Sequence, residues 1–153
     1  MTRVSTTIQP VAPFDFELTA GYHTYFQSRY GTATMEGGVY HRLLDLGDNL
    51  VLACVSSSGT VDAPSLSLEL QGPDLRSEDV DAARCKVSWL LGVHQDLSPF
   101  YALARSDKAM AELVEEFYGL HLPHTATVFE ALMLAVVGPV SYTHLTLPTT
   151  PYV

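Results

Sequence analysis

The sequence predicts an α+β fold in which an antiparallel β-sheet is followed by helices. In the first half of the chain, apolar and polar residues alternate with the period of two that is typical of strands. A short Gly/Asp/Asn turn joins two strand-like runs, and at Ser77 the apolar period changes to about 3.6. Because the strands come first and the helices follow, this order favours α+β over alternating βαβ units.

The predicted strands form an antiparallel sheet of four or five strands. A turn at Gly47–Asn49 joins the middle two runs as a hairpin. Gly72 and Pro73 end the last run. The runs themselves cover residues 13–19, 39–46, 50–55 and 65–70.

Four helices are predicted in the second half, at about 77–91, 99–104, 106–117 and 127–137. Ser77 is expected to cap the first helix, and Pro99 suits the first turn of the second. Gly119 is expected to close the third, and Thr127 with Glu130 forms a capping-box pattern for the fourth. The fourth helix is apolar on nearly every side, which predicts burial at the centre of a larger body.

Composition excludes several classes of protein. At 153 residues and 47% hydrophobic content, the chain can form a real core. A net charge of −9 excludes binding to DNA by bulk positive charge. No run reaches the length of a membrane span or resembles a signal peptide, so we expect a cytoplasmic protein. Cys54 and Cys85 have no CxxC partner and are interpreted as small buried hydrophobes.

Three stretches in a fixed order point to a known family. They are Pro13–Tyr22, Asp96–Ala104, and Phe117–Thr125 followed by Val128–Leu132 and Ala135–Gly138. In this order they resemble the N-terminal portion of DNA-3-methyladenine glycosylase II, the alkylbase-excising branch of the helix-hairpin-helix glycosylases. The resemblance covers roughly Phe14 to Gly138.

The resemblance implies a domain organisation and an activity. A TBP-like sheet with flanking helices would occupy 13–92, after a disordered segment 1–12, and 93–138 would begin the all-helical glycosylase domain. The intact protein would be a monomer that removes alkylated purines from double-stranded DNA, without metal or cofactor. In the family, a Gln that wedges into the DNA follows the glycine matching Gly138, and the hairpin and catalytic Asp lie further along. Here Pro139–Ser141 follows Gly138, so the chain is expected to lack these parts and to be inactive.

The last fifteen residues, 139–153, look like the translation of a sequencing-library adaptor, which would make the end of the chain artificial. A truncated product would be poorly soluble, because apolar side chains of its last helix would be exposed. These side chains are Leu132, Met133, Leu134, Val136 and Val137. Two other interpretations stay open. The tail can be a natural disordered linker, or the chain can be a freestanding, non-catalytic module that binds a ligand or partner.

Tyr22 is the candidate substrate-binding residue. The resemblance implies an aromatic residue at this position, close to the damaged base, and an aromatic face can stack on an electron-poor purine. The alternative is ordinary packing of a tyrosine in a strand-rich region. Gly138 is the DNA-binding candidate, at the edge of the lost wedge. No catalytic residue is expected within the chain.

Two other pairs of polar residues are interpreted as structural. His121 and His124 have the proline Pro123 between them and no third metal ligand nearby, so they are expected to be loop histidines. Asp15 and Glu17 lie two residues apart on a predicted strand, and without an acid-base partner they are expected to be solvated.

Three further features are also given structural interpretations. Glu130 is expected to act only as the second half of the capping box. Trp89 is expected to pack the first helix against the sheet. Arg76, Arg84 and Lys86 are a basic grouping with acidic neighbours, which makes a phosphate-binding patch doubtful.

Overall fold

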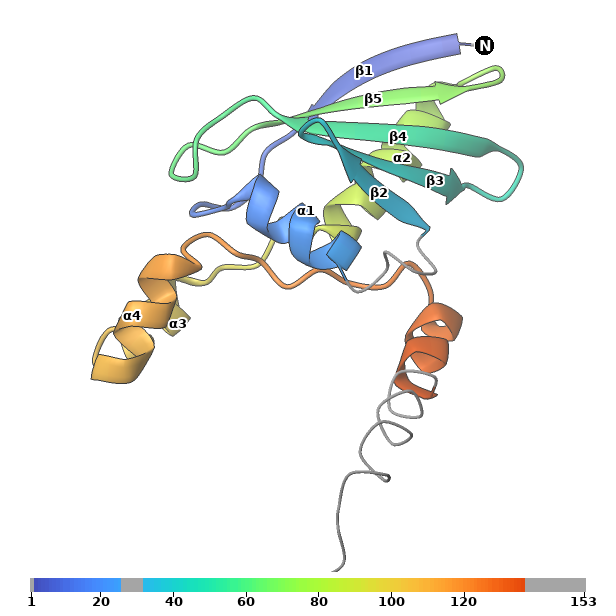
Figure 1. Ribbon diagram of the computed structural model, residues 1–153. Coiled ribbons are helices and arrows are strands. Elements are labelled where there is room, and N and C mark those ends of the chain that lie inside the picture. Colours follow the sequence, from blue (N-terminus) through green and yellow to red (C-terminus); the bar gives the residue numbers. More distant parts are fainter. Residues whose placement is uncertain (1, 26–31, 137–153) are drawn as a thin grey trace, which may run out of the picture.

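The computed structural model describes residues 2–25 and 32–136 and confirms the α+β class. Its centre is a five-stranded antiparallel sheet with the order β1-β5-β4-β3-β2 (Figure 1). Four strands form a continuous meander, and β1 pairs at the far edge with β5. The strands are β1 (Thr2–Ile8), β2 (Ala33–Glu36), β3 (Val39–Asp45), β4 (Leu50–Ser57) and β5 (Leu66–Gly72).

The described helices lie on one side of the sheet, and none of them covers the opposite face, which is called the open face below (Figure 1). They are α1 (Phe16–Tyr25), α2 (Ser77–Leu90), α3 (Ser98–Ala104), α4 (Lys108–Glu116) and a further helix described over 128–136. None of these described helices has the length and apolar character needed to cross a bilayer. Gly138, Val137 and the tail 139–153 lie outside the described residues, and the boundary predicted between 92 and 93 stays a prediction.

The N-terminal segment is a strand, so the prediction of disorder over 1–12 is wrong. Residues Thr2–Ile8 pair in register with Leu66–Gly72 of β5 along their whole length. The strand contributes Ile8, which is 4% exposed, to the core. Its paired residues are 58 to 70 positions away in the sequence, and its other side chains are mostly polar, so the local pattern carries little signal for it.

The run 13–19 is the start of helix α1, which corrects the predicted strand. Asp15 caps the helix, because its Oδ1 accepts from the Leu18 amide at 2.9 Å and its carbonyl accepts from the Thr19 amide at 3.1 Å. The alternation of Phe14, Asp15 and Phe16 therefore marks a helix entry. Asp15 and Glu17 do not share a strand face.

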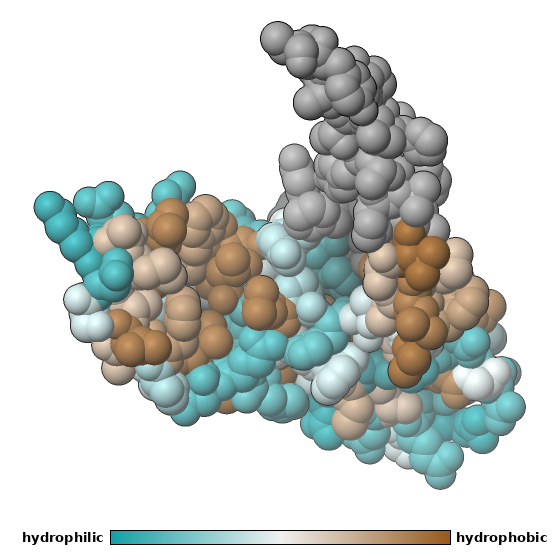
Figure 2. Space-filling view, turned by 90° about the horizontal axis from the view of Figure 1, so that it is seen from below, coloured by the Kyte–Doolittle hydropathy of each residue, from teal (hydrophilic) through white to brown (hydrophobic). Residues whose placement is uncertain are grey.

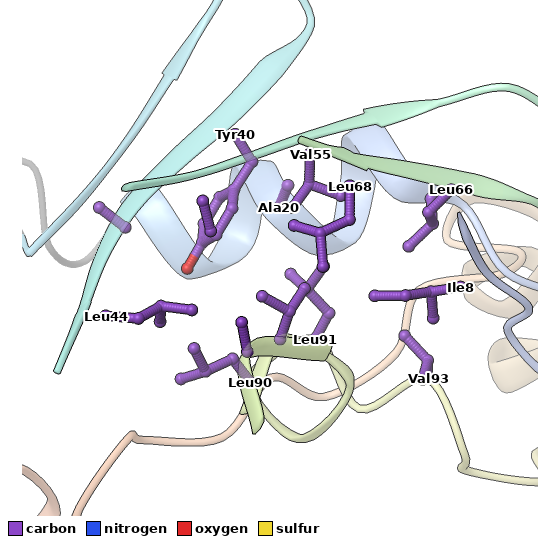
Figure 3. Packing of buried hydrophobic residues seen from close by; sticks show 14 of the residues in the cluster. Ile8, Ala20, Tyr40, Leu44, Val55, Leu66, Leu68, Leu90, Leu91 and Val93 are labelled. Atoms are coloured by element: carbon purple, nitrogen blue, oxygen red, sulfur yellow. The ribbon is translucent and has the colours of Figure 1, made fainter. Parts of the chain in front are cut away.

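The core lies between the sheet and helices α1 and α2 (Figure 3). Helix α2 places Ala83, Val87 and Leu90 against it at helical spacing, and all three are at most 1% exposed. The predicted helix 77–91 is thus confirmed, although its N-cap is Arg76, whose amide donates to Asp79 Oδ2 at 3.0 Å. Burial on one face of the sheet leaves the alternate residues of β5, such as Glu69, on the open face.

Two groups of helices stand away from this core. Helices α3 and α4 form a small cluster around Tyr101, Ala104 and Val114. The helix over 128–136 presents apolar side chains to solvent, with Val128 at 78% and Phe129 at 73% exposure. Figure 2 shows apolar surface gathered in separate areas on this side of the molecule. The helix is therefore not buried within this chain, and the predicted exposure is confirmed for Leu132, Met133, Leu134 and Val136.

Gly119 joins the end of the α4 segment to the start of α1. Its φ is +86°, and an added Cβ would lie 2.7 Å from the Asp15 amide nitrogen and 2.8 Å from Val61 Cγ1. Its carbonyl also accepts from the Asp15 amide at 2.7 Å. A side chain here would meet both backbone strain and a steric clash with backbone atoms.

We expect Gly119→Ala to lower the free energy of unfolding by about 2 kcal/mol or more, because the clash adds to the cost of a positive φ. Urea denaturation measures this change. Gly37→Ala is the matched control: it also has a positive φ, +57°, but no atom lies within 4 Å of the added Cβ. An equal loss in the two variants would show that the close approach to Asp15 contributes nothing.

Candidate functional site

Tyr22 lies on helix α1 and is 44% exposed. Its neighbours Thr19 and His23 are buried, which fixes the rotation of the helix about its own axis. The phenol ring is therefore held on a rigid element and remains accessible. Helix α1, which was not predicted from the sequence, therefore sets the position of the Tyr22 ring.

A buried polar cluster, not predicted from the sequence, joins β3 to helix α1 and to the helix over 128–136. Arg42 of β3 is only 4% exposed, and its Nη2 lies 3.1 Å from Oε2 and 3.3 Å from Oε1 of Glu130. These residues are 88 positions apart in the sequence. Glu130 also accepts from the Ala126 amide at 2.8 Å, and its own amide donates to Thr127 Oγ1 at 3.0 Å. The Thr127 half of the predicted capping box is confirmed, whereas the Glu130 carboxylate accepts from the amide of Ala126, one residue before the cap, and also pairs with a buried cation.

Tyr40 and His23 extend this cluster to helix α1. Tyr40 lies two residues before Arg42 on the same face of β3, and its hydroxyl is 3.1 Å from His23 Nδ1. Burial raises the pKa of Tyr40 to about 12. Burial, and then the nearby Arg42 charge, lowers the pKa of His23 to about 4, so the imidazole is neutral at pH 7. Among the described residues, His23 Nε2 and Arg42 Nη1 are buried without a hydrogen-bond partner.

A groove of about 820 Å³ lies beside the cluster. Its walls come from the end of β3, the outer side of α2 and the helix over 128–136, and include Leu44, Trp89, Phe129 and Met133. The charged residues at its edge are already engaged: Arg42 pairs with Glu130, and Lys86 Nζ donates to the Asp45 carbonyl. Most of the described residues that line the groove are apolar.

Trp89 attaches the segment 121–127 to helix α2, which corrects the predicted role in packing the helix on the sheet. Its ring is 58% exposed and stacks on His124, with ring centres 4.3 Å apart. Its Nε1 donates to the Thr125 carbonyl at 3.0 Å. Trp89 lies two positions after Val87, so it points about 200° around the helix axis from the sheet-facing side.

His121 and His124 both lie outside helices and strands, as predicted for loop histidines, and His121 is in addition fully buried. It is 0% exposed, with Nδ1 2.8 Å from the Gly92 carbonyl and Nε2 2.9 Å from the Pro13 carbonyl. Its amide donates to Thr19 Oγ1 at 3.1 Å. Within the described residues, no group of three or more side chains is arranged to bind a metal. Through its contacts with Pro13, Thr19 and Gly92, His121 connects three segments that are distant in the sequence.

The basic grouping is engaged by acidic and carbonyl oxygens, in line with its interpretation. Arg84 pairs with Asp81 at 3.0 Å, and Arg76 lies 3.7 Å from Asp79. The cysteines differ from the prediction, since Cys85 is exposed and Cys54 is half-buried on the open face of the sheet. Burial raises the pKa of the Cys54 thiol, and both cysteines are free.

Comparison with known proteins shows a likeness in structure. No protein-family model matches the chain, and neither does any curated protein sequence. Among solved structures, the chain is similar to a 3-methyladenine DNA-glycosylase from Archaeoglobus fulgidus, with a TM-score of 0.65 at 18% sequence identity. The match covers 86% of this chain and 43% of that chain. The chain thus has a glycosylase-like fold and spans less than half the length of this neighbour.

Proposed function

We propose that this chain is the N-terminal part of a base-excision repair glycosylase. The intact protein hydrolyses the N-glycosidic bond of alkylated purines that have been flipped out of double-stranded DNA. The observation that carries the proposal is the likeness to a 3-methyladenine DNA-glycosylase over 86% of this chain but only 43% of that one. The resemblance of 13–22, 96–104 and 117–138 to the same family supports it from the sequence.

In this proposal, Tyr22 contacts the damaged base. An alkylated purine is electron-poor and cationic at the modified ring, and an aromatic face attracts such a ring. The partly exposed phenol on helix α1 supports this role, because a base-stacking residue has to be reachable from solvent and held on a rigid element. Gly138, at the edge of the expected wedge position, is proposed as a DNA-contacting residue.

The bond-breaking step belongs to residues outside this chain. An aspartate stabilises the oxocarbenium-like sugar of the intact enzyme, and backbone amides of a hairpin bind the DNA phosphates. With 8 Lys and Arg against 17 Asp and Glu, this chain offers little positive charge for DNA. We therefore propose that it is inactive alone and binds DNA weakly, as a monomer that needs no metal or cofactor.

The direct test has two parts. The genomic sequence across Gly138 should continue with a Gln, a helix-hairpin-helix and a downstream Asp. The product of that gene should release 3-methyladenine from methylated duplex DNA, whereas the 153-residue chain should release none above background. A gene that continues in this way but whose product leaves methylated DNA intact would contradict the proposed activity.

We expect Tyr22→Ala in the intact enzyme to lower kcat/KM by about tenfold to a hundredfold, since stacking on one base contributes about 1–3 kcal/mol. Tyr22→Phe keeps the aromatic face and should stay within about threefold of wild type. Phe100→Ala, which removes an exposed aromatic ring from helix α3, is the matched control. Activity of Tyr22→Ala equal to that of this control would exclude Tyr22 from the base pocket.

The net charge of −9 favours a second candidate, a freestanding module that binds a ligand or partner without catalysis. Like-charge repulsion from DNA phosphates does not hinder such a module. A natural stop codon soon after Gly138 in the genomic sequence would support this candidate over the enzyme.

A further inference from the structure

Most described side chains of the helix over 128–136 are exposed. Its apolar residues Val128, Phe129 and Leu132 are 78%, 73% and 58% exposed, so burial of apolar surface does little to fix its direction. Its first turn, however, carries Glu130, whose carboxylate is only 20% exposed. The orientation of this helix therefore depends on the partners of one carboxylate.

The Glu130 carboxylate binds an arginine that is held on a central strand of the sheet. Arg42 lies on β3, an interior strand with β2 on one side and β4 on the other, and its guanidinium is buried. Because a guanidinium nitrogen that bonds both oxygens of a carboxylate restricts its direction, the pair defines where the helix begins. A buried ion pair contributes little net stability but much geometric specificity when its partners are fixed.

The same strand also holds helix α1. Tyr40 and Arg42 point to the same face of β3, and Tyr40 contacts His23, the residue that follows Tyr22. The Tyr40 and His23 rings stack with centres 5.7 Å apart. Two adjacent inward positions of one strand thus hold two helices that are more than a hundred residues apart in the sequence.

We propose that Arg42 and Glu130 are positioning residues that set the helix over 128–136 relative to helix α1. Tyr40 and His23 complete the network on the α1 side. Resting on the proposed function, this assigns the network the task of keeping Tyr22 in register with the part of the enzyme that follows the helix. The residues touch no substrate and act through the elements they hold.

Arg42→Met tests the proposal in the 153-residue chain without DNA. This variant removes the charge but keeps a long side chain, and it leaves the Glu130 contact with Ala126 intact. We expect amide hydrogen exchange in 128–136 to become at least about tenfold faster, while exchange in β4 and β5 stays within about twofold. Trp89, the single tryptophan, reports the adjoining segment through its contacts with His124 and Thr125, and its emission should shift to longer wavelength.

Asp81→Asn is the matched control, because it breaks an ion pair of similar length, Asp81–Arg84 at 3.0 Å, that is exposed on α2. It should alter neither readout. Glu130→Gln keeps the acceptor for Ala126 and should reproduce the effect of Arg42→Met, whereas Arg42→Lys should restore part of the protection. If Arg42→Met does not fold, Glu130→Gln decides alone.

Unchanged exchange in 128–136 for both Arg42→Met and Glu130→Gln would overturn the proposal. An equal acceleration across β4, β5 and 128–136 would also overturn it, because that result describes a general stabilising role. These measurements involve no DNA or base release, so their outcome is separate from that of the proposed glycosylase activity.

Discussion

Replacing His121 with leucine should lower the free energy of unfolding by about 2–4 kcal/mol. The imidazole is fully buried, and both of its nitrogens lie within 2.9 Å of carbonyl oxygens, one from Gly92 and one from Pro13. Leucine would fill similar volume but remove the ring partner of both carbonyls. The Gly92 carbonyl would keep its bond from the Gln95 amide at 3.1 Å, whereas the Pro13 carbonyl would lose the imidazole, and a buried polar group without a partner costs about 1–3 kcal/mol. It would also remove the edge-on contact with Phe14, whose ring centre is 4.8 Å away.

Urea denaturation followed by circular dichroism measures this loss. His94→Leu is the control, since His94 is exposed and should shift the free energy of unfolding by no more than about 0.5 kcal/mol. We expect His121→Gln to fall between the two, because its side-chain amide nitrogen can donate to one of the two carbonyls. A His121→Leu variant as stable as His94→Leu would show that the carbonyls find other partners.

The second large effect is a dependence of stability on pH that originates at His23. Burial and the Arg42 charge lower its pKa to about 4 in the folded chain, against 6.5 for an unperturbed histidine. Below pH 6.5 the unfolded chain therefore takes up a proton that the folded chain does not, and this favours unfolding. The stability contributed by neutral His23 is fully present above pH 6.5 and is lost as the pH falls through about 4.

The expected loss over this window is about 3 kcal/mol, because each pKa unit corresponds to 1.36 kcal/mol. His23→Phe keeps an aromatic ring beside Tyr40 but cannot titrate, so its free energy of unfolding should decline about 3 kcal/mol less than that of wild type between pH 6.5 and 4. The slope of the free energy of unfolding against pH is not affected by a loss of stability that is the same at every pH. His94→Gln should keep the wild-type slope, and a His23→Phe slope equal to it would exclude His23 as the source.

Local signals allowed part of the fold to be predicted. The hairpin of β3 and β4 follows from its turn residues and strand-like runs, and α2 follows from the spacing of Val80, Ala83, Val87 and Leu90. These elements form hydrogen bonds between near neighbours, and their patterns are therefore visible in short windows. The strand prediction for 13–19 was wrong because three alternating residues fit both a strand and the capped start of a helix. The Asp15 side chain caps the helix that forms there.

The candidate site was accessible to sequence reasoning only in part. Tyr22 was found through a family resemblance, and the structure places it on an exposed face of α1 without testing its role. Arg42, Tyr40 and His23 carried no signal, since a single arginine in a strand is usually solvated. Trp89 was predicted to pack against the sheet, but it lies on the opposite side of its helix. A residue near the end of a helix can instead contact a later segment of the chain, here His124 and Thr125.

The α+β class, the hairpin, the long helix α2 and the cap at Thr127 can be predicted from the residues alone. The pairing of β1 with the sheet, the burial of His121 and the contact of Arg42 with Glu130 across 88 residues follow from the folded arrangement. The two groups differ in the range of the interactions that produce them. Caps, turns and amphipathic periods depend on residues a few positions apart. The pairing of an edge strand and the burial of a charge depend on a partner from a segment that is distant in the sequence.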